Sequence, residues 1–180
     1  TAALTELPIA ESKADMVLIN GKGVVYEIKT DLDDFARLES QIKDYYKAFS
    51  YVNVVVGQKY YRKAKEFLKN TNVGIYVLYD SGNLLPRKRA KCNREQLSYE
   101  SMFQILRKNE YESILLKYNK HLPQTSDFQY YRECCRRMKK LGITTVQKEM
   151  QECLKKRVLL QHDYSMEEKI PYSLRFYAYF

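Results

Sequence analysis

Residues 51–56 read Tyr-Val-Asn-Val-Val-Val, so apolar side chains fall on both faces of an extended chain. The run is short and rich in β-branched residues, which favour strands. It therefore predicts a strand buried on both sides, as in a sheet that is covered by helices. Gly57 ends the run, and residues 74–79 form a second short apolar run that predicts another buried strand.

Two helical patterns accompany these strands. In the first, residues 33–50, apolar side chains recur at intervals of 3, 4, 3 and 4, at Phe35, Leu38, Ile42, Tyr45 and Phe49. This spacing predicts one continuous apolar stripe on a helix. The acids Asp31, Asp33 and Asp34 suit the N-terminus of that helix. Residues 60–69 predict a second, basic helix, whose inward face would hold Tyr61, Ala64, Phe67 and Leu68.

A hairpin precedes the first helix. Residues 16–19 and 24–29 are apolar runs on either side of the glycine-containing turn at residues 20–23. With a further short strand at residues 84–85, the order of elements is β-β-α-β-α-β-β. This order predicts an α/β fold with a mixed central sheet over residues 1–90.

The composition changes at residues 86–91, Pro-Arg-Lys-Arg-Ala-Lys, which we take as the boundary between two regions. Residues 91–180 predict a basic C-terminal α-helical appendage. Its helices are expected at 96–108, 110–120, 127–141 and 145–158. The tail at 170–180 is aromatic and could return to the sheet as a strand.

The charge and the cysteines restrict the partners and the environment. The 180 residues include 31 Lys and Arg against 22 Asp and Glu, a net charge of +9 that favours polyanionic partners. The 4 cysteines form no Cys-x-x-Cys pair, and the 2 histidines are not at ligand spacing to them. This argues against structural zinc and suits a reducing cytosol. No apolar run is long enough for a membrane span, so we expect a cytoplasmic protein.

The hairpin carries the residues most suited to chemistry. On a strand, residues two apart share a face, so Glu27 and Lys29 point the same way. Asp15 joins them only if Ile19 pairs with Gly23 across a three-residue loop, which places residue 15 opposite residue 27. A two-residue loop would instead place Asp15 on the wrong face.

Two adjacent carboxylates repel each other unless a cation lies between them. Mg²⁺ or Mn²⁺ is the cation expected for Asp15 and Glu27, since both ions prefer oxygen ligands. The backbone carbonyl of Ile28 is a further expected ligand, and Glu11 could supply another acid. Lys29 could orient a water molecule or hold charge on phosphate oxygens.

These residues also have simpler readings. A Glu-x-Lys pair on a strand occurs often by chance, and charged groups on a hairpin are usually solvated. Tyr45 belongs to the apolar stripe of its helix, so core packing explains it without a ligand. Gln41 lies one residue off that stripe, where a solvated position is plausible. What favours a site is the apolar strand around Glu27, because unpartnered charges there are costly.

Asp15, the Glu27-x-Lys29 pair and the following helix resemble the PD-(D/E)xK, or restriction-endonuclease-like, nuclease superfamily. Gln41-Ile42-Lys43-Asp44-Tyr45 is similar to the Q-x-x-x-Y element of its RecB-like branches. The similarity is closest to a small bacterial and phage family, and it covers roughly residues 11–57. One departure is that only ten residues precede the hairpin, where the superfamily usually has a helix.

The resemblance implies a restriction-endonuclease-like core that acts on DNA and needs a metal. It implies Asp15 and Glu27 as metal ligands, Lys29 as the catalytic lysine, and Gln41 and Tyr45 beside the site. The leading hypothesis is therefore a Mg²⁺-dependent deoxyribonuclease, and an RNA-directed enzyme would share its chemistry. The alternative is a catalytically silent DNA-binding or protein-interaction module of phage, mobile-element or defence systems.

Basic clusters in both regions are expected to contact the phosphate backbone, although solvated helix faces would explain them equally well. The residues assigned to nucleic-acid binding are Arg87, Lys88, Arg89, Arg136, Arg137 and Lys140. A homodimer would place two sites against one duplex.

Overall fold

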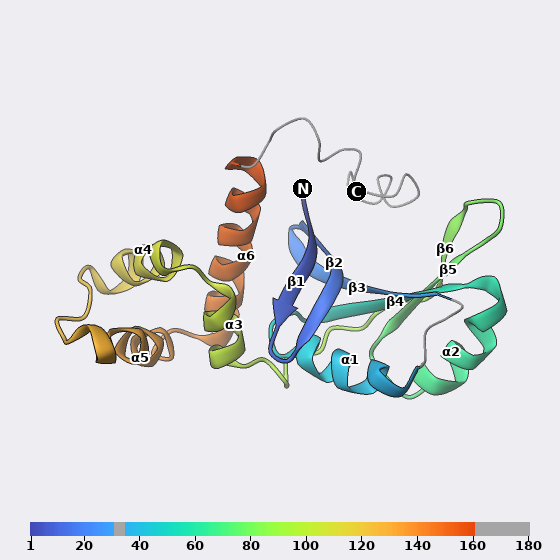
Figure 1. Cartoon of the computed structure of the whole chain (residues 1–180), viewed down its shortest axis with the longest axis horizontal. Coiled ribbons are helices and arrows are strands. Elements are labelled where there is room, and N and C mark those ends of the chain that lie inside the picture. Colours follow the sequence, from blue (N-terminus) through green and yellow to red (C-terminus); the bar gives the residue numbers. More distant parts are fainter. Residues whose placement is uncertain (31–34, 161–180) are drawn as a thin grey trace.

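The computed structural model describes residues 1–30 and 35–160 (Figure 1). Their strands form one six-stranded sheet in which the spatial order follows the chain, β1-β2-β3-β4-β5-β6. The strands are β1 Ala2–Ile9, β2 Ser12–Asn20, β3 Lys22–Lys29, β4 Tyr51–Gly57, β5 Gly74–Leu78 and β6 Leu84–Lys88. The three central strands β3, β4 and β5 are parallel, and the outer pairs are antiparallel. The predicted mixed α/β sheet is confirmed.

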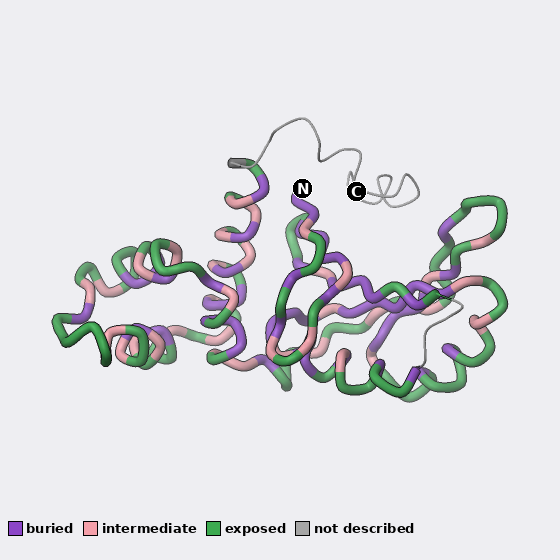
Figure 2. Tube along the Cα trace, viewed as in Figure 1, coloured by how far each residue is buried: buried purple, intermediate pink, exposed green. Residues whose placement is uncertain are grey.

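Two helices cover one face of this sheet. A 3₁₀ turn at Phe35–Arg37 leads into α1 (Leu38–Tyr46), and a second turn at Gln58–Tyr60 leads into α2 (Tyr61–Leu68). Both helices lie below the sheet in Figure 1. Each one connects two parallel strands, which require a crossover rather than a tight turn. Their inner faces are buried and their outer faces are exposed (Figure 2).

Four further helices form the second region: α3 (Tyr99–Ile105), α4 (Lys108–Asn119), α5 (Asp127–Met138) and α6 (Ile143–Leu160). The α4–α5 pair projects away from the sheet, while α3 and α6 pack against β1 (Figure 1). One hydrophobic cluster runs from Val54 in the sheet to Met102 in α3 and Met150 in α6. Gln147 of α6 donates to the carbonyl of Ala48 at 2.9 Å, which adds a buried polar link.

The structure differs from the sequence expectations at several elements. Strand β1 was not expected; its pairing with β2 adds an edge strand to the predicted order. The basic run begins inside the sheet, since β6 extends to Lys88. Phe67, expected inward, has 42% of its surface exposed and packs edge-on against Phe35. The acids at 31–34 and the tail at 170–180 lie outside the described residues.

Candidate active site

The hairpin register brings Asp15 to β3. Ile19 pairs with Gly23, as the three-residue loop requires, and Gly21 at the turn has φ +66°, a conformation that glycine adopts without strain. The pairing of β2 with β3 runs as far as Met16 with Tyr26, and beyond that pair the side chain of Asp15 takes the place of a backbone partner. The backbone N–H of Ile28 donates to Asp15 Oδ2 at 2.7 Å. Of the two loop lengths that the sequence left open, the structure has the odd one, which the nuclease hypothesis requires.

Glu27 and Lys29 lie on the face of β3 that α1 covers. Their side chains are 2% and 9% exposed, and Lys29 Nζ lies 2.8 Å from Glu27 Oε1. Burying either charge alone would be costly, and the ion pair offsets that cost. The apolar strand around these charges therefore holds a partnered pair rather than solvated side chains.

Helix α1 completes the cluster from below. Gln41 and Tyr45 are one helical turn apart, so both face β3. Gln41 Nε2 donates to Glu27 Oε1 at 2.7 Å, and its Oε1 accepts from Lys29 Nζ at 2.9 Å. Tyr45 Oη donates to Glu27 Oε2 at 2.5 Å and also lies 3.0 Å from the carbonyl oxygen of Lys13. Gln41 and Tyr45 therefore belong to a polar network around Glu27, and neither is simply a solvated or a core residue.

Two pKa shifts follow from this packing. Burial raises the pKa of Asp15 above its ordinary value, and the charge of Glu27 adds to the increase, although the Ile28 N–H and Lys29 act in the opposite direction. Burial and the hydrogen bond to Glu27 raise the pKa of Tyr45, so its hydroxyl stays protonated and acts as a donor. Asp15 is thus an acid that a nearby cation would stabilise in its charged form.

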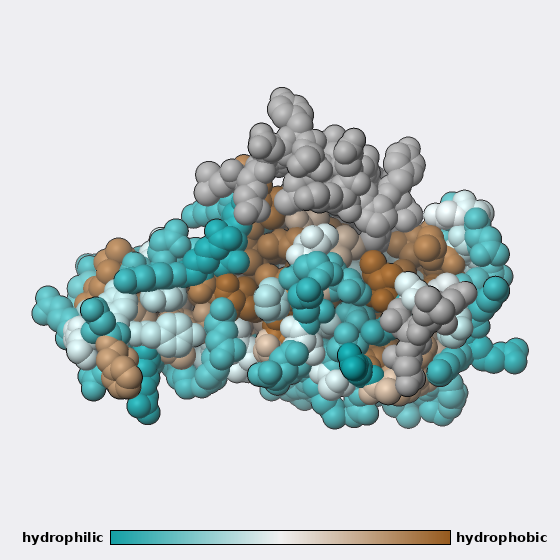
Figure 3. All heavy atoms as spheres, in the orientation of Figure 1, coloured by the Kyte–Doolittle hydropathy of each residue, from teal (hydrophilic) through white to brown (hydrophobic). Residues whose placement is uncertain are grey.

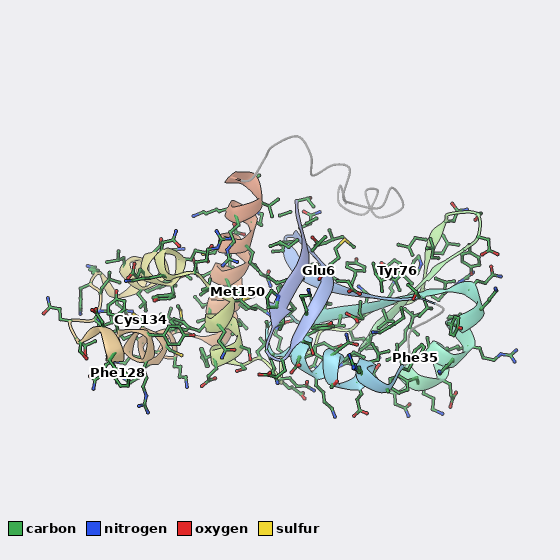
Figure 4. The ribbon with its side chains drawn as sticks, in the orientation of Figure 1. Glu6, Phe35, Tyr76, Phe128, Cys134 and Met150 are labelled. Atoms are coloured by element: carbon green, nitrogen blue, oxygen red, sulfur yellow. The ribbon has the colours of Figure 1, made fainter. Side chains whose placement is uncertain are left out.

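Glu6 is a further acid that sequence reasoning missed. It lies opposite Asp15, because Thr5 pairs with Met16 and Leu7 with Ala14 on either side. Its charge contributes to the raised pKa of Asp15. Its backbone has φ +57°, a left-handed conformation that is unusual for a residue other than glycine. The sequence could have pointed to Glu6 only through a prediction of strand β1 and its pairing with β2. Figure 4 labels Glu6 on this strand.

The structure does not bring Glu11 to this cluster. Glu11 is exposed in the turn between β1 and β2, beyond the last pair of these strands, Ile9 with Ser12. Asp44, on α1, is also buried, but it accepts from Ser12 Oγ at 2.6 Å and pairs with Lys47 at 2.7 Å. Neither acid is therefore placed as a third carboxylate beside Glu27.

The donor set suits a hard cation with few protein ligands. Within residues 1–30 and 35–160 there is no group of three or more His, Cys, Asp or Glu side chains that could hold a metal. Mg²⁺ commonly uses one or two carboxylates, with water and phosphate oxygens completing its shell. Asp15 and Glu27, together with the Ile28 carbonyl, fit that requirement, provided that Lys29 yields one oxygen of Glu27.

The residues assigned to nucleic-acid binding lie at opposite ends of the molecule, one group on or just after β6 and the other on or just after α5 (Figure 1). Lys88 Nζ donates to the carbonyl oxygen of Thr71 at 2.7 Å, so its charge is already used to hold the chain after α2. Arg136 pairs with Glu133 at 2.7 Å, and Arg137 pairs with the same acid. Arg87 donates to the hydroxyl of Tyr79, whereas Arg89 and Lys140 are exposed. These residues do not form one continuous patch.

The fold and the cluster define the class: a mixed α/β protein in which a buried glutamate–lysine pair on β3 is hydrogen-bonded by a glutamine and a tyrosine of α1. The chain belongs to the bacteriophage P4 protein cII family, whose model matches residues 1–170. The phage part of the family resemblance is thereby confirmed, and its nuclease part stays a prediction. None of the helices in the described part of the chain is long and apolar enough to cross a bilayer.

Comparison with curated proteins finds no match. Two solved structures are similar at low level. SPO1766, a protein of unknown function from Silicibacter pomeroyi, has a TM-score of 0.42 and 13% identity, covering 69% of this chain and 84% of that one. SfsA from Pyrococcus furiosus, solved in complex with Ca²⁺, has a TM-score of 0.29 and 14% identity, covering 50% and 54%. Similarity at this level does not establish a shared fold.

Asp15→Asn is expected to raise the melting temperature at pH 7. The raised pKa of Asp15 means that ionising it costs more in the folded than in the unfolded chain, so stability falls as pH rises from about 3.8 through the folded pKa. Asparagine keeps an oxygen for the Ile28 N–H but carries no charge. Thermal unfolding at pH 7 and pH 3 should show the gain only at pH 7, and exposed Asp80→Asn serves as control. A lower melting temperature at pH 7 would contradict the assignment.

Proposed function

We propose that this protein is a metal-dependent nuclease that hydrolyses phosphodiester bonds, with DNA as its preferred substrate. The observation that carries the proposal is the cluster of Glu27, Lys29, Gln41 and Tyr45, joined by hydrogen bonds of 2.5 to 2.9 Å. Asp15, held by the Ile28 N–H, lies near enough for its charge to interact with those of Glu27 and Lys29. Acids from neighbouring strands and one amine at a single spot are what such chemistry requires. The net charge of +9 favours a polyanionic substrate.

Each residue has a distinct task in this proposal. Asp15 and Glu27 would hold Mg²⁺ or Mn²⁺, which when bound supplies Lewis-acid polarisation of a phosphate oxygen and activates a water molecule. Tyr45 fixes Glu27 through its second oxygen, so that the carboxylate cannot rotate away. Gln41 holds both Glu27 and Lys29 in place. Lys29, once released from Glu27, is the cation within reach of phosphate charge that develops during attack.

A second candidate function is a catalytically silent module that binds DNA or protein. Both oxygens of Glu27 already accept hydrogen bonds, from Lys29 and Gln41 on one side and from Tyr45 on the other. A cluster whose hydrogen bonds are all made within the protein can also have a purely structural role, because its buried ion pair needs no ligand. Metal-dependent cleavage separates the two functions, because the silent module does not hydrolyse nucleic acid.

The direct test incubates labelled duplex DNA, single-stranded DNA and RNA with the protein, with Mg²⁺, Mn²⁺ or EDTA. We expect DNA cleavage only with a divalent ion, and its loss in Asp15→Asn. We also expect Mn²⁺ to raise the melting temperature of the wild type but not of Asp15→Asn, because binding to the folded state stabilises it. Glu39→Gln, on the outer face of α1, is the control. A thermal shift without cleavage would favour a silent relative. If Mn²⁺ caused neither a thermal shift nor cleavage, the assignment of a metal site would be wrong.

A further inference from the structure

A pocket lies on the other face of the sheet, away from the acid–lysine cluster. It has a volume of about 400 Å³, within the usual range for small-molecule sites. Its lining comes from all five strands β2 to β6 and includes Tyr26, Tyr51, Tyr76, Asn53, Lys22 and Arg89. Figure 4 places Tyr76 above the strands, whereas Phe35 lies below them among the helices. Hydrophobic atoms gather on the same upper face in Figure 3.

The floor of the pocket is built by the strand register. Tyr26, Asn53 and Gly74 form one row across three parallel strands. Asn53 is 4% exposed, although it is the one polar residue in the run of residues 51–56. A Cβ on Gly74 would lie 2.0 Å from Asn53 Oδ1, so the missing side chain is what lets the carboxamide lie across β5. A buried amide in a tyrosine-lined pocket is a group suited to reading a polar ring edge.

The walls are aromatic and the rim is basic. Tyr26 and Tyr76 meet edge to face with ring centroids 5.7 Å apart. Tyr51 lies two residues before Asn53 on β4, and therefore on the same face. Lys22 Nζ lies 4.4 Å from the ring centroid of Tyr51, so a cation and an aromatic face are presented together. Arg89 adds a second exposed cation at the other side, where β6 has ended. Within residues 1–30 and 35–160, the lining holds no Asp or Glu to oppose these charges.

We propose that this pocket binds a nucleotide. The planar base stacks on the tyrosine rings, the Asn53 carboxamide hydrogen-bonds the edge of the base, and Lys22 and Arg89 contact the phosphate. Any base can stack on aromatic side chains. The two cations favour a ligand with a phosphate, so we expect a nucleotide to bind more tightly than the corresponding nucleoside. The nucleotide is either free or part of a single strand, since both present the same chemistry. This assignment does not depend on the nuclease proposal, because it involves the opposite face of the sheet and no metal.

The test measures binding in EDTA, with the full chain and no cleavage step. The small probes, measured by calorimetry, are AMP, thymidine monophosphate, the two matching nucleosides and inorganic phosphate. A labelled oligothymidylate of ten nucleotides is measured by fluorescence anisotropy. We expect saturable binding of a nucleotide that is roughly tenfold weaker in Arg89→Gln and in Lys22→Gln, as for loss of a charged hydrogen bond. Arg62→Gln, on α2 at the other face, should bind like the wild type. Tyr76→Leu keeps an apolar side chain but removes the aromatic ring, and it should weaken nucleotide binding.

The outcomes are distinct. Binding of the oligonucleotide alone identifies a strand as the source, and binding of the mononucleotides as well identifies free nucleotides. Nucleosides that bind as tightly as nucleotides would overturn the assignment of Lys22 and Arg89, and phosphate that binds as tightly would overturn base recognition. No saturable binding by any probe, or an equal loss in Arg62→Gln, would overturn the site. Since no metal is present, none of these results bears on the cleavage test.

Discussion

Lys29→Ala is expected to lower metal-dependent DNA cleavage by about 10²–10³-fold, which is typical when one charge-stabilising group is removed from an active site. The matched control is Lys43→Ala, on the outer face of α1, where Lys43 pairs only with Glu39 four residues before it. The control should cleave like the wild type, because exposed i,i+4 pairs contribute little. Initial rates on labelled DNA with Mn²⁺ measure both variants.

Lys29→Ala also removes the cation from buried Glu27, so part of any loss could come from the fold. Lys29→Arg separates the two effects. It keeps a charge beside Glu27, but a planar guanidinium does not reproduce the position of Nζ between Glu27 and Gln41. We expect Lys29→Arg to unfold near the wild-type temperature and still to lose most cleavage. Cleavage that persists in Lys29→Ala at a wild-type rate would remove Lys29 from the mechanism.

Phe103→Ala is expected to reduce the free energy of unfolding by about 3–5 kcal/mol, as for other buried aromatic truncations. Phe103 is 1% exposed and lies with its ring centroid 4.7 Å from that of Tyr111 and 4.9 Å from that of Tyr131. The loss is a large fraction of the stability of an ordinary domain. Phe128→Ala is the matched control, because Phe128 is 95% exposed and its removal should change stability by less than about 0.5 kcal/mol.

The same variant tests whether residues 1–90 and 91–180 unfold separately. One hydrophobic cluster joins Phe103 to the sheet, so we expect a single transition that shifts as a whole in Phe103→Ala. Denaturant titration followed by circular dichroism and by tyrosine fluorescence should give coincident curves. Two separated transitions, with only one moved by the substitution, would instead show that the helical region is an independent unit.

Local patterns were enough to predict most elements. The β-branched run at 51–56 became β4, and the apolar stripe that includes Leu38, Ile42 and Tyr45 became the inner face of α1. The alternation of side chains showed that an odd-length hairpin loop is needed to place Asp15 with Glu27, because a register shift of one residue would move Asp15 to the other face. The pairing of Ile19 with Gly23 agrees with it.

Other features had no local signal. Strand β1 reads Ala-Ala-Leu-Thr-Glu-Leu-Pro-Ile, with little β-branching, and it is held as a strand by its pairing with β2. The exposure of Phe67 follows from the way α2 lies on the sheet, which the helical period does not define. Lys88 was expected to bind phosphate, but its ammonium lies beside the carbonyl of Thr71. Each case depends on a contact between residues that are far apart in the chain.

The amino-acid sequence by itself determined most of the elements and the set of residues that could form a site, because these follow from periodicity and from turn residues over short stretches of chain. Only the tertiary structure decided that Gln41 and Tyr45 hydrogen-bond Glu27, that Glu6 lies opposite Asp15 and that Asn53 lies in a tyrosine-lined pocket. Those outcomes depend on burial and long-range packing, and the free energy of a buried charge is set by the groups that surround it rather than by its neighbours in the chain.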